Sequence, residues 1–382
     1  MDWRKIREDS EKNLSRHAVR SAQSLGRQVA EEKCPIRTDF ERDHNRILYS
    51  VDFRRLRHKT QVFFNAKNDH ICTRMEHVLY VAAIASTITR TLNLNQDLAY
   101  AIALGHDLGH APFGHSGERV LDRCVKQIDE SLTFKHETHS LRVVDRLARR
   151  ISAESRTERI GLNLTFEVRD GIVCHCGENY SEFRIEPERT KTPDRLCEAD
   201  IRQQSPATLE GCVVRLADKI AYVGRDIEDA VRVGMISIDD IPKDVLGELG
   251  FTNGQIINTL VSDLIGNSYE KPFIALSREK GEALEELIHE NVLRIYRAER
   301  IAEYEKSMSN TMEGLFAGLY HALEKGAEEM ASAEEKVLRQ FAKYLIVQDY
   351  DDKEKPGQKV LDFVAGMTDS FALKCYEELY WM

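Results

Sequence analysis

The chain has 382 residues, of which 31% are charged, and a formal net charge of -10 at pH 7. That length can bury one large core or two intimate ones, and the acidic balance argues against a dedicated nucleic-acid-binding protein. Eight cysteines follow no disulfide spacing, and we find neither a signal peptide nor an apolar run of about 18 residues. We therefore expect a cytoplasmic protein without a membrane span.

The pattern along the chain predicts helices almost throughout. Only eight prolines occur, and Leu, Ala, Glu, Lys and Arg are abundant. Residues 35–64 are rich in arginine and aromatic side chains and predict loop and short helix. Helical periodicity then dominates residues 74–104, 138–150, 211–233 and 278–345, and alternating strand patterns are scarce. We expect an all-α fold.

The segment HDLGHAPFGHSGE, residues 106–118, concentrates side chains that are suited to catalysis. It holds three histidines and two carboxylates among glycines and a proline. Neutral imidazole and carboxylate are natural ligands for a divalent metal, and imidazole is the usual proton carrier near neutral pH. The segment therefore predicts the centre of a metal-dependent hydrolytic site.

His77, His106 and Asp218 each fall on a stripe of apolar residues at helical spacing. A lone histidine on an apolar face is more often a satisfied core residue than a ligand. That interpretation weakens when two such histidines and a buried aspartate occur together, because an unpaired buried carboxylate is costly. One shared cation would satisfy all three side chains together with Asp107.

Along the chain, one histidine is followed by an adjacent His–Asp pair and later by a distant aspartate. This pattern resembles the HD-domain superfamily of metal-dependent phosphohydrolases, which are helical proteins. Neighbouring segments make the resemblance narrower. The chain resembles the deoxynucleoside triphosphate triphosphohydrolases, the dGTPase-like family, in RDHNRILYSVDFRRLRHKTQVF (residues 42–63), TRMEH (73–77), HDLGHAPFGHSGE (106–118), FKHE (134–137), GLNLT (161–165) and ADKIAYVGRDIEDA (217–230). The resemblance implies an HD-domain helical core at residues 37–235. An N-terminal segment (1–36) would precede this core, and a C-terminal helical region (236–382) would pack on it.

The resemblance also implies roles for individual side chains. The implied metal ligands are His77, His106, Asp107 and Asp218. The implied catalytic residues are His115, Glu118 and His136, with Glu118 orienting His115. The implied substrate contacts are Arg74, His110 and Lys219 on the phosphates and Gln61, Tyr222 and Asp226 on the deoxyribose. Two imidazoles and two carboxylates suit Mn, Fe, Co, Ni or Zn, and we also expect activity with Mg.

The implied reaction is hydrolysis of dGTP or other dNTPs at the α-phosphorus, which yields deoxynucleoside and inorganic triphosphate. The metal would activate water, and His115 would protonate the departing 5'-oxygen, a role that His136 could share. Two alternatives stay open. One is an HD phosphodiesterase or nucleotidase that releases monophosphate or orthophosphate, and the other is a nucleotide or nucleic-acid sensor with an inactive HD site.

The resemblance further implies a homo-oligomer, either a hexamer or a tetramer. It also implies an activating dNTP at a second site and weak binding of single-stranded DNA. The basic run at residues 54–59 could bind the phosphate of a regulatory nucleotide or of nucleic acid, although such runs more often pack their stems and solvate their charged ends. Cys174, His175 and Cys176 suggest zinc, but ligands at alternate positions do not match the paired spacing of zinc sites.

Overall fold

The computed structural model describes residues 1–63, 71–151, 158–176 and 181–380. Within these ranges most of the chain is helical and very few residues lie in strands, which confirms the expected all-α class. The helices of the first half are α1 Trp3–Ser10, α2 Asp39–Leu48, α3 Val51–Arg55, α4 Arg74–Thr91, α5 Gln96–Gly105, α6 Gly114–Ile128, α7 His136–Arg142 and α8 Phe166–Val173. Those of the second half are α9 Leu209–Arg232, α10 Lys243–Leu249, α11 Asn253–Ser268, α12 Arg278–Asn291, α13 Glu299–Lys325, α14 Ala327–Ser332, α15 Lys336–Gln348, α16 Pro356–Ala365 and α17 Asp369–Tyr380.

Two small antiparallel sheets lie between the helices. The strands are β1 Arg149–Ile151, β2 Glu158–Ile160, β3 Arg184–Ile185 and β4 Ile274–Ala275. β1 pairs with β2 so that Arg149 lies opposite Ile160, and β3 pairs with β4 so that Arg184 lies opposite Ala275. The second sheet ties the segment that follows α8 to the segment that precedes α12.

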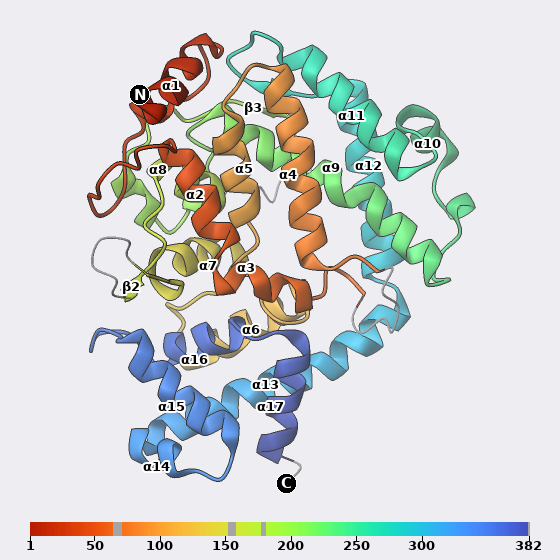
Figure 1. Cartoon of the computed structure of the whole chain (residues 1–382). Coiled ribbons are helices and arrows are strands. Elements are labelled where there is room, and N and C mark those ends of the chain that lie inside the picture. Colours follow the sequence, from red (N-terminus) through yellow and green to blue (C-terminus); the bar gives the residue numbers. More distant parts are fainter. Residues whose placement is uncertain (64–70, 152–157, 177–180, 381–382) are drawn as a thin grey trace.

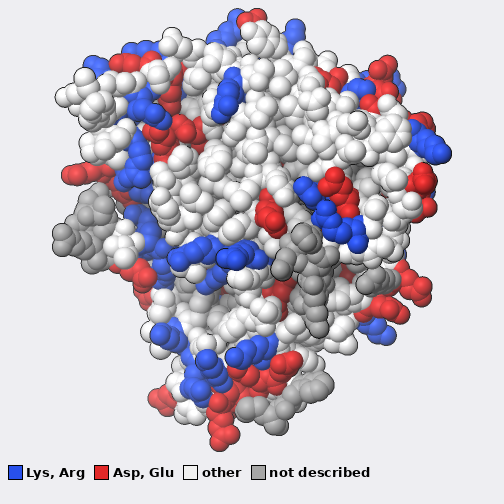
Figure 2. All heavy atoms as spheres, turned by 45° about the vertical axis from the view of Figure 1, so that its right-hand side comes forward, with Lys and Arg blue, Asp and Glu red and all other residues white. Residues whose placement is uncertain are grey.

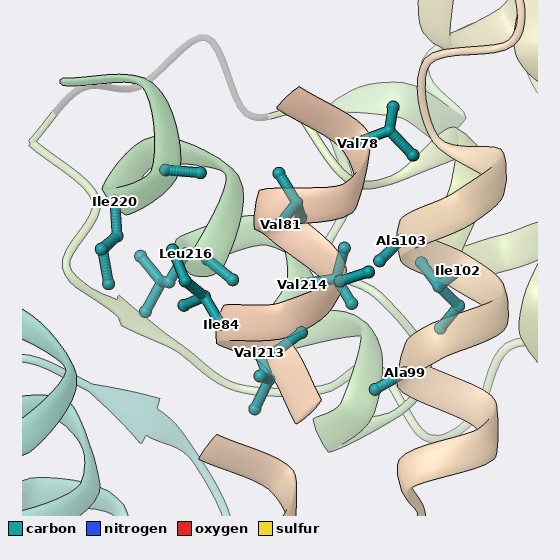
Figure 3. Packing of buried hydrophobic residues seen from close by; sticks show 14 of the residues in the cluster. Val78, Val81, Ile84, Ala99, Ile102, Ala103, Val213, Val214, Leu216 and Ile220 are labelled. Carbon is teal, nitrogen blue, oxygen red and sulfur yellow. The ribbon is translucent and has the colours of Figure 1, made fainter. Parts of the chain in front are cut away.

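The larger of two hydrophobic clusters surrounds α4, α5 and α9, the helices on or next to which the predicted metal ligands lie. Val81 of α4, Ile102 of α5 and Val214 of α9 are buried in it, as Figure 3 shows. α4 packs against both α5 and α9. These three helices form a rigid frame because apolar side chains fill the space between them.

A second hydrophobic cluster joins the C-terminal helices to α6, in the lower part of Figure 1. Leu121 of α6 and Leu315 of α13 are fully buried in this cluster. Ala111 and Phe113, from the predicted catalytic segment, also belong to it. Residues 106–118 therefore lie where the two clusters meet.

Two of the expected helical stretches correspond closely to helices in the structure. Residues 74–104 form α4 and α5, which are separated because the chain turns at Asn93, whose φ is 54°. The Asn95 side chain then accepts a backbone N–H at the start of α5. Residues 211–233 correspond to α9, whose N-terminus is capped by the Thr208 side chain.

Two other expected stretches do not continue as single helices. Residues 138–150 leave the helical path through a π-helical turn, Val143–Leu147, and enter β1. Residues 278–345 are interrupted by a second π-helical turn, Val292–Tyr296, and by Gly326, whose φ of 107° ends α13. Apolar periodicity continues across these breaks because both flanking segments pack on buried side chains.

Charged side chains of both signs are scattered over the face shown in Figure 2, mostly toward its edges, around a large uncharged area. Lys and Arg gather in a band at mid-height of this face, so the net negative charge of the chain leaves locally basic surface. Within the described parts of the chain, no helix combines the length and apolar character that a bilayer crossing requires.

Candidate active site

The four predicted metal ligands converge in the first core. His77 lies in the first turn of α4, whose start is set by a capping box at Thr73. His106 and Asp107 follow the last residue of α5, and Asp218 lies midway along α9. Because α4 packs on both of the other helices, these four side chains meet, and we call them the metal-ligand group.

Both imidazoles of the metal-ligand group face both carboxylates. His77 Nε2 lies 2.9 Å from Asp218 Oδ1 and 3.9 Å from Asp107 Oδ2. His106 Nε2 lies 3.6 Å from Asp107 Oδ1 and 3.9 Å from Asp218 Oδ1. The donor atoms of the group thus surround one small volume.

The ring of His106 shows that this group fits a cation. Its Nδ1 lies 2.7 Å from the carbonyl oxygen of Ala103, and since a carbonyl can only accept, Nδ1 carries the proton. Nε2 therefore presents a lone pair, and this buried atom has no hydrogen-bond partner among the described residues. A divalent cation would satisfy it, while the backbone carbonyl fixes the tautomer that coordination requires.

The two carboxylates are held in the ionised form that a cation needs. Burial opposes ionisation of Asp218, but the hydrogen bond from His77 and the charges of the surrounding imidazoles together outweigh it and lower the pKa of Asp218 to about 2. Burial also opposes ionisation of Asp107, but Arg74 and the neighbouring imidazoles hold its pKa well below the ordinary value. Both side chains are therefore anionic at neutral pH.

Arg74, a predicted phosphate contact, lies directly beside the metal-ligand group. Its Nη1 lies 2.6 Å from Asp107 Oδ2, and its other nitrogens donate to the carbonyl oxygens of Thr60 and Gln61 at 3.4 and 3.5 Å. The Gln61 side-chain oxygen is buried and has no partner among the described residues. A buried guanidinium in this position can donate hydrogen bonds to a phosphate that binds next to a metal cation.

The loop that carries the adjacent His–Asp pair requires glycine where α7 approaches it. We call residues 106–113 the histidine loop. A Cβ atom on Gly109 would lie 2.1 Å from the backbone nitrogen of Ser140, and the Gly109 amide donates to the Ser140 hydroxyl at 2.8 Å. This close approach places His136, at the start of α7, against His110.

A second group of polar side chains lies next to the metal-ligand group. The histidine cluster consists of His110, His115, Glu118 and His136, whose candidate ligand atoms lie within 4.8 Å of one another. The rings of His110 and His136 stack with centroids 4.0 Å apart. His115 meets these rings edge-on, at 5.1 and 5.7 Å. The structure therefore brings the three predicted catalytic residues together.

Glu118 contacts two histidines, and the shorter contact is not the expected one. Its Oε2 lies 2.8 Å from His136 Nδ1 but 3.6 Å from His115 Nδ1. Burial lowers the pKa of His136, but Glu137 and Glu118 outweigh it and raise that pKa to about 9. Glu118 therefore primarily orients His136, which is protonated at neutral pH, whereas the His115 side chain is 64% exposed.

The remaining predicted contacts follow the metal ligand of α9 along the same helix. Lys219 is buried, with Nζ 3.4 Å from the carbonyl oxygen of Glu182, and Tyr222 is half-buried. Asp226 is buried and accepts a hydrogen bond from the hydroxyl of Tyr296. Burial raises the pKa of Asp226 to about 7. One helix thus carries a predicted metal ligand, a cation, an aromatic ring and a hydrogen-bonding carboxyl group.

Two known domains and several relatives match this chain. Residues 74–223 match the HD domain, and residues 274–378 match the phosphohydrolase-associated domain. A deoxyguanosinetriphosphate triphosphohydrolase-like protein of Caldanaerobacter subterraneus subsp. tengcongensis is 40% identical over 381 residues, covering 100% of this chain and 96% of the relative. Proteins with the same name from Desulfatibacillum aliphaticivorans and Clostridium perfringens are 38% and 35% identical, with 96% and 98% of this chain and 95% and 98% of the relatives covered. The chain belongs to the deoxyguanosinetriphosphate triphosphohydrolase-like family of HD-domain proteins.

Membership in this dGTPase-like family confirms the resemblance that the motifs indicate. The protein is an HD-domain phosphohydrolase, and HD domains bind divalent metals. The HD match contains the whole metal-ligand group and α6, and the phosphohydrolase-associated match contains the C-terminal helices that pack on α6 in the second cluster. The histidine loop thus lies where the two matched domains pack together.

One further side chain of this dGTPase-like protein lies in the site, although its sequence context suggested only a zinc pattern. His175 is buried, and its ring centroid lies 4.9 Å from that of His106 and 5.4 Å from that of His136. Its Nδ1 donates to the carbonyl oxygen of Ile172 at 2.6 Å, and one of its ring nitrogens lies within 4.8 Å of ligand atoms of His106 and Asp218. Burial lowers the pKa of His175 to about 4, so the ring is a neutral acceptor beside the metal-ligand group.

A signal in the sequence could have identified His175 but not Tyr296, the partner of Asp226. His175 continues the apolar stripe of Val168 and Ile172 at helical spacing, which is the signal that marks His77. Tyr296 lies 70 residues beyond Asp226 and ends a π-helical turn, so no local pattern connects the two side chains.

Proposed function

We propose that this dGTPase-like protein hydrolyses deoxynucleoside triphosphates, either dGTP or other dNTPs, at the α-phosphorus. The products are deoxynucleoside and inorganic triphosphate. The observation that carries the proposal is the convergence of the metal-ligand group beside the histidine cluster. The relatives' printed name, deoxyguanosinetriphosphate triphosphohydrolase-like protein, supports the choice of substrate.

We propose Mn or Mg as the working cation, held by the metal-ligand group, with Fe, Co, Ni or Zn as other fitting occupants. Mixed imidazole and carboxylate donors favour a transition metal, whereas Mg prefers mostly oxygen ligands. The orphaned Nε2 of His106 supports direct coordination by nitrogen. When bound, the cation supplies Lewis acidity, which polarises a phosphoryl oxygen and lowers the pKa of water.

The proposed triphosphate contacts are Arg74, His110 and Lys219. Arg74 and Lys219 are buried cations on either side of the metal-ligand group in the chain, and His110 lies 3.3 Å from Asp107 through its Nε2. Hydrogen bonds between charged donors and phosphate oxygens are stronger than neutral ones, and they restrict the orientation of the bound triphosphate.

The proposed deoxyribose contacts are Gln61, Tyr222 and Asp226. Gln61 offers a buried side-chain oxygen without a partner among the described residues, and Asp226 is oriented by Tyr296. We propose that Gln61 and Asp226 bind the 3'-hydroxyl. Tyr222 packs on the sugar, which would disfavour a 2'-hydroxyl there.

In the proposed reaction, the oxygen of water forms a bond to the α-phosphorus, and the bond from phosphorus to the 5'-oxygen breaks. The departing 5'-oxygen then needs a proton. His115 supplies it, and His136 shares this role, because Glu118 and Glu137 keep His136 protonated at neutral pH. Proton donation thus comes from the histidine cluster, and phosphate charge is neutralised by Arg74 and the metal-ligand group.

We also propose that the protein is a cytoplasmic homo-oligomer, either a hexamer or a tetramer. A second dNTP site that activates it and weak binding of single-stranded DNA complete the proposal. Light scattering of the purified protein tests the oligomeric state. Turnover of single dNTPs compared with dNTP mixtures tests activation, and DNA affinity at several salt concentrations tests nucleic-acid binding.

Product analysis tests the proposed function. The purified protein would be incubated with each dNTP, each rNTP and their mixtures, with Mg or Mn, and the products separated by ion-exchange chromatography. We expect deoxynucleoside and intact triphosphate from at least one dNTP, and no turnover of the rNTPs. Release of monophosphate or orthophosphate would instead indicate a phosphodiesterase or nucleotidase, and no turnover in any mixture would favour a sensor.

A further inference from the structure

A buried polar bridge joins the C-terminal helices to the histidine loop. Asp369, the first residue of α17, is only 5% exposed. Its Oδ1 accepts the backbone N–H of Phe113 at 3.0 Å. Its Oδ2 accepts both the backbone N–H of Thr60, at 2.9 Å, and the Thr60 hydroxyl. One carboxylate thus connects α17 to two segments that border the active site.

Lys59 makes a second connection at the same place. Its side chain is buried, and Nζ donates to the carbonyl oxygens of His110 and, at 2.8 Å, Ala365. Ala365 ends α16, and Asp369 begins α17, so both connections lead to the turn between these two helices. We call Lys59 and Asp369 the clamp.

The backbone that the clamp holds is in an unusual conformation. Phe113 has a φ of 63°, in the left-handed region that bulky residues rarely adopt, and Gly114 follows with a φ of 60°. Such a conformation persists only when surrounding contacts determine it. The amide of Phe113 bonds to the clamp, and its side chain is packed in the second hydrophobic cluster.

Three residues with proposed roles in the reaction lie next to the clamp: His110, His115 and Arg74. His110 and His115 stand on either side of Phe113, and the carbonyl oxygen of Lys59 accepts the backbone N–H of Arg74 at 3.1 Å. The carbonyl oxygen of Thr60 also accepts a hydrogen bond from Nε of Arg74. Lys59 bonds to the backbones of His110 and Arg74, and Thr60 links Asp369 to Arg74. His115 is reached only through the chain, two residues after the amide that Asp369 binds.

We propose that Asp369 and Lys59 are positioning residues through which the phosphohydrolase-associated domain sets the geometry of the active site. The inference rests on the proposed function for its kinetic consequence, but the structural role is independent of the substrate. The clamp holds the histidine loop at Phe113 and His110 so that His110 and His115 face the substrate phosphates. The clamp contacts the histidine loop from His110 onward, whereas His106 and Asp107, at the start of the loop, continue directly from α5 in the first core. The metal-ligand group should therefore retain a bound cation when the clamp is weakened.

Asp43 offers a matched control for substitution of Asp369. It is also a buried carboxylate, and its Oδ2 accepts both the backbone N–H and the hydroxyl of one threonine, Thr165, at 2.8 and 2.7 Å. Its Oδ1 is bound by Arg27. Asp43→Asn therefore removes a similar set of hydrogen bonds, and its partners Arg27 and Thr165 form their side-chain hydrogen bonds with residues outside the histidine loop. Substitution of Asp369 and substitution of Asp43 should both lower the Tm, but only substitution of Asp369 should alter the active site.

The kinetic experiment compares Asp369→Asn, Asp369→Ala and Asp43→Asn in the full chain. Because small misplacements of catalytic groups are costly, we expect Asp369→Ala to lower kcat about 100-fold, with a smaller loss in Asp369→Asn, which keeps one acceptor oxygen. Metal content should stay at the wild-type value. The kcat of Asp43→Asn should stay within about twofold, as expected for a site without shared partners. Equal losses of kcat in the Asp369 and Asp43 variants would overturn the proposal.

Amide hydrogen exchange tests the structural part without any substrate. Asp369→Asn should speed exchange at residues 110–117 and leave α4 and α5 protected, whereas Asp43→Asn should not affect residues 110–117. If the Asp369 variants fail to fold, Lys59→Met tests the clamp in their place. It removes the hydrogen-bond donor, keeps the apolar stem and should give the same exchange pattern. Unchanged exchange at residues 110–117 in both clamp variants would overturn the proposal. An inactive wild-type protein whose clamp variants show the expected exchange would refute the proposed function alone.

Discussion

The metal-ligand group and the histidine cluster differ in how the fold supports them. Every member of the metal-ligand group lies on or beside a helix of the first core, and the apolar packing of α4, α5 and α9 holds it. The histidine cluster instead lies on the histidine loop, α6 and α7, where the two hydrophobic clusters meet. His106 is fully buried, whereas the His115 side chain is 64% exposed.

This difference indicates a division of labour between rigid and adjustable parts. A cation needs fixed donors, and a single packed core provides them. Proton transfer to a leaving group needs access to the substrate, and a loop held between two cores permits it. Substitutions in the metal-ligand group should therefore impair function together with metal binding. Substitutions in the histidine cluster should impair function and leave metal binding intact.

The largest effect is expected from His106→Ala. Loss of a direct ligand should weaken metal affinity by more than the roughly 10- to 100-fold that is lost when only a hydrogen-bond partner of a ligand is removed, and activity should fall with it. Metal content measured by plasma mass spectrometry after dialysis checks this. His139→Gln, at another buried neutral histidine, serves as the control and should retain the metal. A His106→Ala protein that keeps both metal and turnover would remove His106 from the metal-ligand group.

The next effect is expected in the histidine cluster. His136→Asn and His115→Ala should each lower kcat by roughly 100- to 10,000-fold, the usual contribution of general acid–base catalysis. We expect the larger loss for His136→Asn, because His136 is the closer partner of Glu118. Metal content should stay unchanged in both variants. Full turnover by His115→Ala with metal bound would exclude His115 as the proton donor.

A smaller effect is expected for Glu118→Gln, and it should appear in the pH profile. The pKa of His136 is lowered by burial but raised to about 9 by Glu137 and Glu118, so activity that needs its proton should decline as pH rises through about 9. Removing the Glu118 charge lowers this pKa, and the alkaline limb should therefore move to lower pH. The pH dependence of kcat for wild type and variant measures the shift. An unmoved limb would mean that His136 does not control it.

The smallest effect is expected for Tyr296→Phe. This change removes the hydrogen bond to Asp226 and keeps the ring. A neutral hydrogen bond contributes about 1 kcal/mol, so kcat/KM should fall about fivefold. Steady-state kinetics with a dNTP and its 3'-deoxy analogue check the assignment. The variant should affect the analogue less, because the analogue lacks the hydroxyl that Asp226 would bind, and an equal effect on both substrates would argue against that contact.

The sequence predicted the metal-ligand group more completely than its surroundings. Apolar stripes in α4 and α9 mark His77 and Asp218 because helical periodicity is a local signal. The closer pairing of Glu118 with His136 was not predicted, since it depends on how α7 packs against α6. Tyr296 was missed for the same reason, because contacts between distant segments leave no pattern in either one.

The course of the helices was predicted less well than the fold class. Residues 138–150 and 278–345 keep apolar periodicity while the backbone changes to π-helical turns and, in the first case, a strand. Burial requires apolar side chains in either conformation, so composition alone cannot locate these changes. The clamp is a similar case, because Asp369 lies far along the chain from Thr60 and Phe113.

Hydrolysis of a dNTP in ¹⁸O-labelled water, with the metal-loaded protein, tests the central claim most directly. Attack of water on the α-phosphorus with cleavage of the bond to the 5'-oxygen places the label in the triphosphate and leaves the deoxynucleoside unlabelled. Mass spectrometry of both products should show this distribution. Label in the deoxynucleoside, or products that consist of monophosphate and pyrophosphate, would contradict the account.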